Sequence, residues 1–210
     1  MFLRNVLLAI LLLLAFIPQS QNNSQDFNYR KSYSIAEKFY HTENPDALTD
    51  SLALKNYGYA IAVLKKNNAD DSILFDCYVK AGIISMSAGA ENNAIHFFLE
   101  SVELHNRKSF LPDSLLFQSY LYTGNSYYNI INMDSALYYY KQAEFIVSKY
   151  PLLSEAERLY NQTGALYYAT GDYKKSIIYF TKALSITEDR LPVNKYFVVN
   201  YKNNIASAYR

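Results

Sequence analysis

The side chains best suited to chemistry are few and scattered in this 210-residue chain. Its three histidines, His41, His96 and His105, do not recur at the i, i+4 spacing of a helical zinc site. Its single cysteine, Cys77, stands among apolar residues at helical spacing, which predicts a buried thiol. The sequence contains no Gly-x-Ser-x-Gly motif and no phosphate-binding glycine loop. We therefore expect a protein that is not an enzyme, with no catalytic residue, no metal and no cofactor.

The composition favours a packed globular chain and gives no electrostatic reason to expect a nucleic-acid partner. Hydrophobic residues make up 50% of the chain and charged residues 19%, and the formal net charge is +1. Nucleic acids and anionic membrane surfaces are normally bound by a basic stripe, whereas the lysines and arginines here are interspersed with acidic residues. We expect no nucleic-acid partner, and membrane contact only through the N-terminal segment.

That N-terminal segment has the order of a secretory signal peptide. The short basic stretch MFLRN precedes a twelve-residue apolar run from Val6 to Ile17, and the polar residues PQSQ follow. Twelve apolar residues are fewer than the roughly 20 that a membrane-spanning helix needs. We therefore predict a signal peptide over 1–20, with an uncleaved N-terminal anchor as the alternative, and a linker over 21–28. The protein is then expected to be exported to the periplasm or cell envelope of a bacterium.

Two patterns of small and aromatic residues recur along the rest of the chain, at intervals of 40 to 42 residues. The first is small-x-x-x-aromatic-x-x-small, and it occurs at Ala53, Tyr57, Ala60; at Ala94, Phe98, Ser101; at Ala136, Tyr140, Ala143; and at Ser176, Phe180, Ala183. The second is a series of small residues at Gly82, Gly124, Gly164 and Ala206. Spacings of three, four and seven place residues on one face of a helix, so each pattern marks one helix. We interpret the small residues as points where two helices approach closely, with the aromatic rings filling the remaining space.

Each repeat is therefore predicted to be a pair of helices, A and B, joined by a tight turn. In the clearest repeat, Gly171 suits the left-handed position that ends a helix, and Asp172 can cap the next helix. The fold class is all-α, a right-handed α-solenoid of stacked helix–turn–helix repeats over 29–210. The predicted units are a degenerate one at 29–67, units at 71–107, 113–149 and 154–189, and a partial one at 193–210.

These residues resemble the tetratricopeptide repeat (TPR) family. The best-matched unit carries Tyr160, Gly164, Tyr167, Gly171-Asp172-Tyr173, Ser176, Phe180 and Ala183 at the family's positions. The family's usual period is about 34 residues, and the longer period here is similar to that of peptide-binding members such as kinesin light chain. Since the excess lies in the connectors and helix ends, we prefer this family, of a bacterial exported type, to a HEAT-like solenoid, the alternative fold.

The resemblance also implies a binding site. In this family the first helix of each repeat lines a concave face that binds a peptide or a partner protein, and amide and tyrosine side chains suit such a surface. Carried over by register, the candidate peptide-binding residues are Gln118, Tyr122, Asn125, Tyr128, Asn129, Arg158, Asn161, Gln162, Tyr168, Asn203 and Asn204. The paired cations that bind a C-terminal carboxylate in chaperone-docking members are missing, and only Lys80 and Arg158 approach that role. We therefore predict an exported protein-interaction scaffold.

The last predicted helix is a helix A with no helix B after it. Its apolar residues Phe197, Val198, Val199 and Ile205 would be left without the cover that a next repeat supplies. We expect further repeats to follow Arg210, and self-association of the isolated chain through this helix.

Two other functions stay open. One is the N-terminal sensor region of a truncated membrane signalling protein, such as a histidine kinase or a helix-turn-helix regulator. The other is the repeat region of a truncated enzyme.

Overall fold

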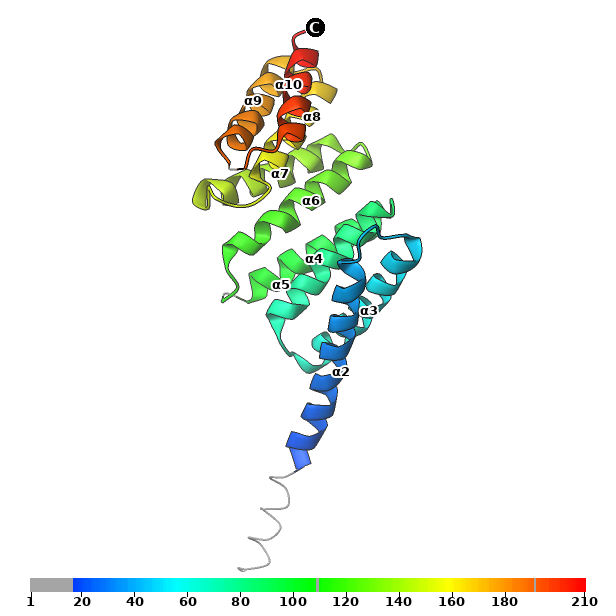
Figure 1. The fold of residues 1–210 in the computed structure, drawn as a ribbon. Coiled ribbons are helices and arrows are strands. Elements are labelled where there is room, and N and C mark those ends of the chain that lie inside the picture. Colours follow the sequence, from blue (N-terminus) through cyan, green and yellow to red (C-terminus); the bar gives the residue numbers. More distant parts are fainter. Residues whose placement is uncertain (1–16, 109, 191) are drawn as a thin grey trace, which may run out of the picture. The chain divides into compact units, whose positions relative to one another are not determined.

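The computed structural model describes residues 17–108, 110–190 and 192–210, with side chains from residue 29 onward. Throughout these ranges the regular elements are helices, and no strand occurs (Figure 1). Most of the expected signal peptide lies outside the described residues, whereas the range 21–28, expected to be a linker, lies within the helix α2 (Ile17–Tyr40). Among the helices that are described, none combines the length and apolar character needed to cross a membrane. The all-α fold class predicted from the repeats is confirmed.

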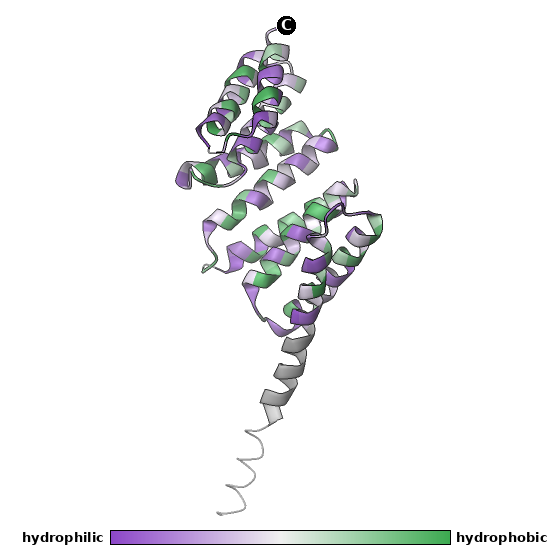
Figure 2. Ribbon diagram, in the orientation of Figure 1, coloured by the Kyte–Doolittle hydropathy of each residue, from purple (hydrophilic) through white to green (hydrophobic). Residues whose placement is uncertain are grey.

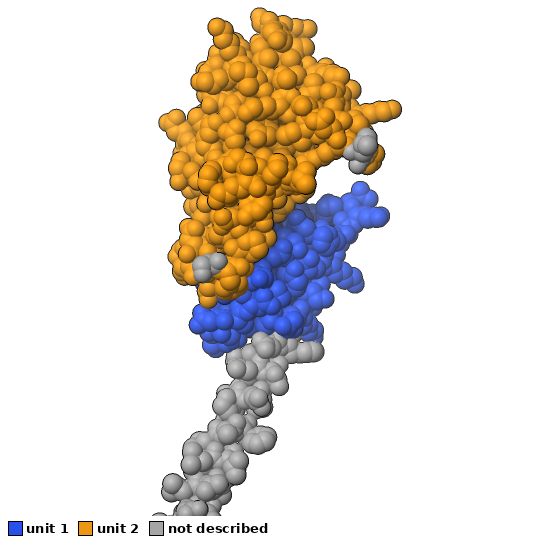
Figure 3. Space-filling model, turned by 90° about the vertical axis from the view of Figure 1, so that its left-hand side faces the viewer, with its two compact units in different colours: residues 1–84 blue, residues 85–210 orange. Residues whose placement is uncertain are grey.

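The chain divides into two compact units, residues 1–84 and residues 85–210, which Figure 3 shows in separate colours. The boundary falls inside one helix, α4 (Asp71–Ser87). The repeat pattern runs through 29–210 as one array and does not show this division. The candidate site residues all belong to the second unit.

The first unit contains α2, α3 (Ala47–Asn67) and the part of α4 up to Ile84, and a half-buried polar network joins these three helices. The Lys80 ammonium lies 2.8 Å from the Glu37 carboxylate and 2.8 Å from that of Asp76. The Tyr57 hydroxyl donates a hydrogen bond to the Glu37 carboxylate, and the Tyr33 hydroxyl donates one to the Asp76 carboxylate. Lys80 was expected to approach the role of a ligand-binding cation. Its ammonium instead forms ion pairs with the Glu37 and Asp76 carboxylates within this unit.

Among the described residues, the second unit contains the end of α4, six further α-helices and one short 3₁₀ helix. These are α5 (Glu91–Arg107), the short 3₁₀ helix η1 (Asp113–Leu115) leading into α6 (Leu116–Asn129), α7 (Met133–Lys149), α8 (Ala156–Ala169), α9 (Tyr173–Asp189) and α10 (Lys195–Ala208). Each α-helix from α5 to α9 packs against the next one in the chain. Figure 2 shows hydrophobic and hydrophilic residues side by side along these helices, as expected when one stripe of each helix is buried.

Two glycines of the second pattern, Gly124 and Gly164, are close-contact points between helices, as the sequence predicts. A Cβ atom built on Gly124 of α6 would lie 2.5 Å from two ring carbons of Tyr140 in α7. One built on Gly164 of α8 would lie 2.6 Å from a ring carbon of Phe180 in α9. Both rings are buried, with exposed fractions of 1% and 3%. Since non-bonded carbons prefer separations of about 3.5–4.0 Å, only glycine permits these helix pairs to approach so closely.

Each tight turn inside a helix pair contains one residue in the left-handed backbone conformation. Gly89 and Gly171 occupy it with φ of 73° and 82°, and Ile131 occupies it in the middle turn with φ of 62°. A β-branched residue is strained in this conformation. After the turn, the side chain of Asp172 accepts a hydrogen bond from the Lys175 backbone N–H at 3.1 Å, which confirms it as the cap of α9.

Candidate functional site

The first helices of successive pairs, α6, α8 and α10, share one face of the second unit. α8 contacts both α6 and α10, so side chains from non-consecutive helices meet there. Two pockets open on this face, and Asn204 of α10 lines both of them. This is where most of the candidate residues gather.

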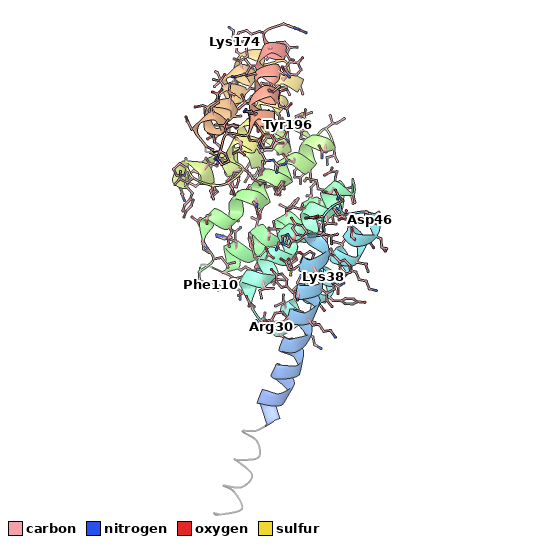
Figure 4. The ribbon with its side chains drawn as sticks, viewed as in Figure 1. Arg30, Lys38, Asp46, Phe110, Lys174 and Tyr196 are labelled. Carbon is pink, nitrogen blue, oxygen red and sulfur yellow. The ribbon has the colours of Figure 1, made fainter. Side chains whose placement is uncertain are left out.

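The larger pocket, which we call the amide pocket, has a volume of about 330 Å³ and lies between α8 and α10. Its α8 wall consists of Arg158, Asn161 and Gln162. Its α10 wall consists of Tyr196, Phe197, Asn200, Tyr201 and Asn204. The Asn204 side-chain amide donates to the Asn161 side-chain oxygen at 2.9 Å and so links the two walls. Tyr196, labelled in Figure 4, stands in the first turn of α10.

The charged group of the amide pocket is the Arg158 guanidinium, and it is held by the Glu155 carboxylate, which also accepts a hydrogen bond from Tyr122. The Arg158 guanidinium donates to one carboxylate oxygen of Glu155 at 2.9 Å, and Tyr122 of α6 donates its hydroxyl proton to the other oxygen at 2.9 Å. Glu155 stands just before α8 with φ of 66°, a left-handed conformation whose cost of about 1–2 kcal/mol these hydrogen bonds offset. Burial lowers the pKa of Arg158, but Glu155 outweighs burial and the net effect is a raised pKa. The arginine therefore stays charged and paired.

The second pocket, which we call the aromatic pocket, has a volume of about 240 Å³. Its walls come from four helices: Tyr128 of α6, Ala165 and Tyr168 of α8, Phe180 of α9, and Asn204 and Ser207 of α10. The Tyr168 side chain is 42% exposed, and its ring packs edge-on against that of Tyr173 at 5.4 Å. Three aromatic rings line the pocket beside the polar side chains of Asn204 and Ser207, and the rings offer contact area for an apolar group.

Six of the eleven candidate residues line these pockets, and five do not. The six that are brought together are Tyr128, Arg158, Asn161, Gln162, Tyr168 and Asn204. Tyr122 is 8% exposed and bonded to Glu155, and Asn125 accepts a hydrogen bond from the Tyr140 hydroxyl at 2.9 Å, so both support the helices. Asn129 donates to Glu91 at 2.7 Å, and Gln118 and Asn203 are exposed outside both pockets. The register places these five on helix A, but neighbouring side chains decide which of them face a pocket.

The aromatic wall of the amide pocket was not among the candidate residues. α10 begins eleven residues before Ala206, whereas α8 begins eight residues before Gly164, so α10 has an additional first turn. Tyr196 and Phe197 lie in that turn, and a register carried over from α8 omits them. The sequence does hold a sign of the early start, because Asn194 caps α10 by accepting from the Tyr196 backbone N–H at 3.1 Å.

The histidines and acidic residues do not form a metal site within the described part of the chain. There, no group of three or more His, Cys, Asp or Glu side chains is placed to hold a metal ion. His41 lies 3.4 Å from Glu37, and His105, largely buried, lies 3.6 Å from Asp113. Cys77 is a free, fully buried thiol, as expected.

Comparison with known proteins identifies the repeat. Residues 157–190 match the family model of the tetratricopeptide repeat. Among curated proteins, no sequence matches this chain.

Several solved structures share the fold at low sequence identity. BtubC (BKLC) from P. vanneervenii is 12% identical with a TM-score of 0.62, over 88% of this chain and 83% of that one. A kinesin light chain with nearly identical TPR-like repeats, from Podosopora anserina, is 14% identical with a TM-score of 0.66, over 86% and 84%. Aspartyl phosphate phosphatase F from Bacillus subtilis is 13% identical with a TM-score of 0.72, over 86% of this chain and 46% of that one. At such identities the likeness establishes the TPR-like fold.

Proposed function

We propose that this chain, which carries a tetratricopeptide repeat and has a TPR-like fold, is an exported scaffold that binds a peptide segment of a partner protein. The peptide lies on the face shared by α6, α8 and α10, the expected concave face. The observation that carries the proposal is the pair of adjacent pockets on this face, joined at Asn204. TPR-like folds generally serve protein–protein interaction, which agrees with this arrangement.

The chemistry of the face suits an extended peptide. Side-chain amides offer both a donor and an acceptor, so they can bond the backbone N–H and C=O groups of a peptide without requiring a charged ligand. Tyrosine rings supply apolar area with a polar tip, a combination enriched at protein interfaces. Asn161 and Asn204 bond each other across the two helices at 2.9 Å, which orients both amides before a ligand arrives.

The binding face can be tested with two matched variants. Peptides selected from a displayed random library on the purified chain would be titrated against wild type, Asn161→Ala/Asn204→Ala and Asn203→Ala. The double variant removes the amides that join the two pockets, and we expect at least about a tenfold loss of affinity from the lost hydrogen bonds. Asn203, one residue away and exposed outside both pockets, serves as the control. Equal affinity for wild type and the double variant would show that the peptide binds elsewhere.

Export is the second part of the proposal, and it rests on the residue order of 1–20. The N-terminus of the mature protein, determined by mass spectrometry after cell fractionation, distinguishes the outcomes. A protein that begins near residue 21 in the periplasmic or envelope fraction supports a cleaved signal peptide. One that begins at Met1 in the membrane fraction supports the anchor, and one found intact in the cytosol contradicts export.

A further inference from the structure

The amide pocket contains polar groups that no protein neighbour satisfies. Tyr201 is only 3% exposed, yet its hydroxyl makes no hydrogen bond with any residue that the structure describes, and the side chain lines the pocket. Gln162 and Asn200 are half-buried in the same walls, and within the described chain their side-chain amides are likewise unbonded. Polar groups on a pocket wall that no protein neighbour bonds are free to bond water or a ligand that enters the pocket. Three polar groups of this kind on the walls of one pocket can therefore bond a single ligand.

The charges around the pocket are already paired. Arg158 is bonded to Glu155, as described above. On the other side of α8, Glu157 accepts a hydrogen bond from the Arg190 guanidinium, which also donates to the Leu153 carbonyl oxygen. A ligand carboxylate would have to share the Arg158 charge with Glu155, and a ligand ammonium would find no carboxylate among the residues that line the pocket. The pocket favours an uncharged group.

The unpaired groups require both a donor and an acceptor from the ligand. Burial raises the pKa of Tyr201 to about 12, so its hydroxyl keeps its proton at neutral pH and can donate. The amides of Gln162 and Asn200 each offer an acceptor oxygen and a donor nitrogen. A primary carboxamide is the uncharged side-chain group of proteins that matches this set, since it presents an acceptor oxygen and two N–H donors on one plane. The stacked rings of Phe197 and Tyr201, 5.9 Å apart, provide apolar surface for its methylene groups.

We propose that the amide pocket is a specificity subsite for the side chain of a glutamine or asparagine in the bound peptide, and that the aromatic pocket takes a nearby apolar side chain. The inference rests on the proposed function and adds to it the kind of sequence that the face selects. Asn204 lines both pockets, so the two peptide residues are close in sequence. Side chains two residues apart point to the same side of an extended peptide, which makes that spacing the simplest arrangement.

The same library selection tests this inference separately from the proposed function. We expect enrichment of glutamine or asparagine together with a large apolar residue. For a selected peptide, replacing Gln by Glu or by Met should each weaken binding about tenfold or more, since a site built to hydrogen-bond a group rejects analogues that leave it unpaired. The affinity should also change little with salt, because no charged pair forms.

Two matched protein variants assign the effect to the pocket. Tyr201→Phe removes the unpaired hydroxyl and should weaken the glutamine peptide about tenfold, without lowering the thermal stability of the chain. Tyr209→Phe makes the same change on a tyrosine that is 73% exposed and outside both pockets, and should have no effect on binding.

Three results would overturn the inference, and they differ in what they leave standing. If peptides bind this face, as shown by loss of binding to Asn161→Ala/Asn204→Ala, but carry acidic residues or no amide preference, the carboxamide subsite is wrong and the proposed function stands. If Tyr201→Phe binds the selected peptides as tightly as wild type, the assignment to this pocket is wrong. If no peptide is selected, both the subsite and the peptide-binding function fail.

Discussion

Replacing Gly124 by alanine tests the close helix approach on which the stacking depends. The added methyl group would lie 2.5 Å from two ring carbons of Tyr140 and 3.3 Å from the Ala136 carbonyl oxygen. The ring cannot easily move away, because Tyr140 is 1% exposed and its hydroxyl is bonded to Asn125. Helix α6 and helix α7 would therefore have to separate.

The size of the effect follows from two opposing terms. Overpacking a buried contact costs about 1–3 kcal/mol, and two contacts this short favour the upper end. Alanine in a helix interior returns about 1 kcal/mol relative to glycine. We expect a net loss of about 2 kcal/mol in the free energy of unfolding. Urea unfolding followed by circular dichroism measures it directly.

Gly58→Ala is the matched control. Gly58 lies inside α3, and a Cβ atom built there would meet no other atom within 4 Å. This variant should gain about 0.5–1 kcal/mol from helix propensity alone. The double variant Gly124→Ala/Tyr140→Leu should show a smaller cost for the alanine than wild type does, because the ring is gone. If Gly124→Ala were as stable as Gly58→Ala, the close-contact explanation of the small residues would be refuted.

Three further predictions concern other parts of the chain. Ile131→Gly should stabilise the second unit by about 0.5–1 kcal/mol, since relief of the left-handed strain exceeds the entropy cost of glycine, and a lower urea midpoint would contradict this. Burial raises the pKa of Glu37, but hydrogen bonds from Lys80 and Tyr57 outweigh it, so the folded-state pKa is lowered. Its contribution to stability is then complete above the ordinary value of 4.5 and is lost as pH falls below it, so Glu37→Gln should flatten the acid loss of stability in melts from pH 7 to pH 3. On α10, Val199 is 57% exposed, so we expect the purified chain to self-associate through this helix. Light scattering should give a lower average molar mass for Val199→Lys than for wild type, and equal molar masses would exclude this interface.

Much of the fold could be predicted because helix packing in a repeat is local. The recurrence of Gly124 and Gly164 predicted the helical period and a close helix contact at each glycine, and the structure adds which ring, Tyr140 or Phe180, each glycine meets. The turn at Gly171 and the cap at Asp172 were likewise readable, since one left-handed residue and one capping side chain are required there. These features depend on residues within about one repeat of each other.

The site was only partly predictable, because its walls come from helices two elements apart in the chain. The repeat register placed Asn161 and Asn204 on helix A, but the hydrogen bond between them depends on how α8 and α10 pack. Tyr196 and Phe197 line the pocket because α10 begins with an additional turn that α8 of the preceding repeat lacks. The side chains of Tyr122 and Lys80 are of types that bind ligands, but Tyr122 is bonded to Glu155 and Lys80 is paired with Glu37. A periodic pattern predicts which face of a helix a residue lies on, but it does not predict the partners of its side chain. The helical period and the contacts of small residues depend on residues close together in the sequence. The hydrogen-bond partner of a side chain, and whether it faces a pocket, depend on helices that are distant in the sequence and meet only in the folded chain.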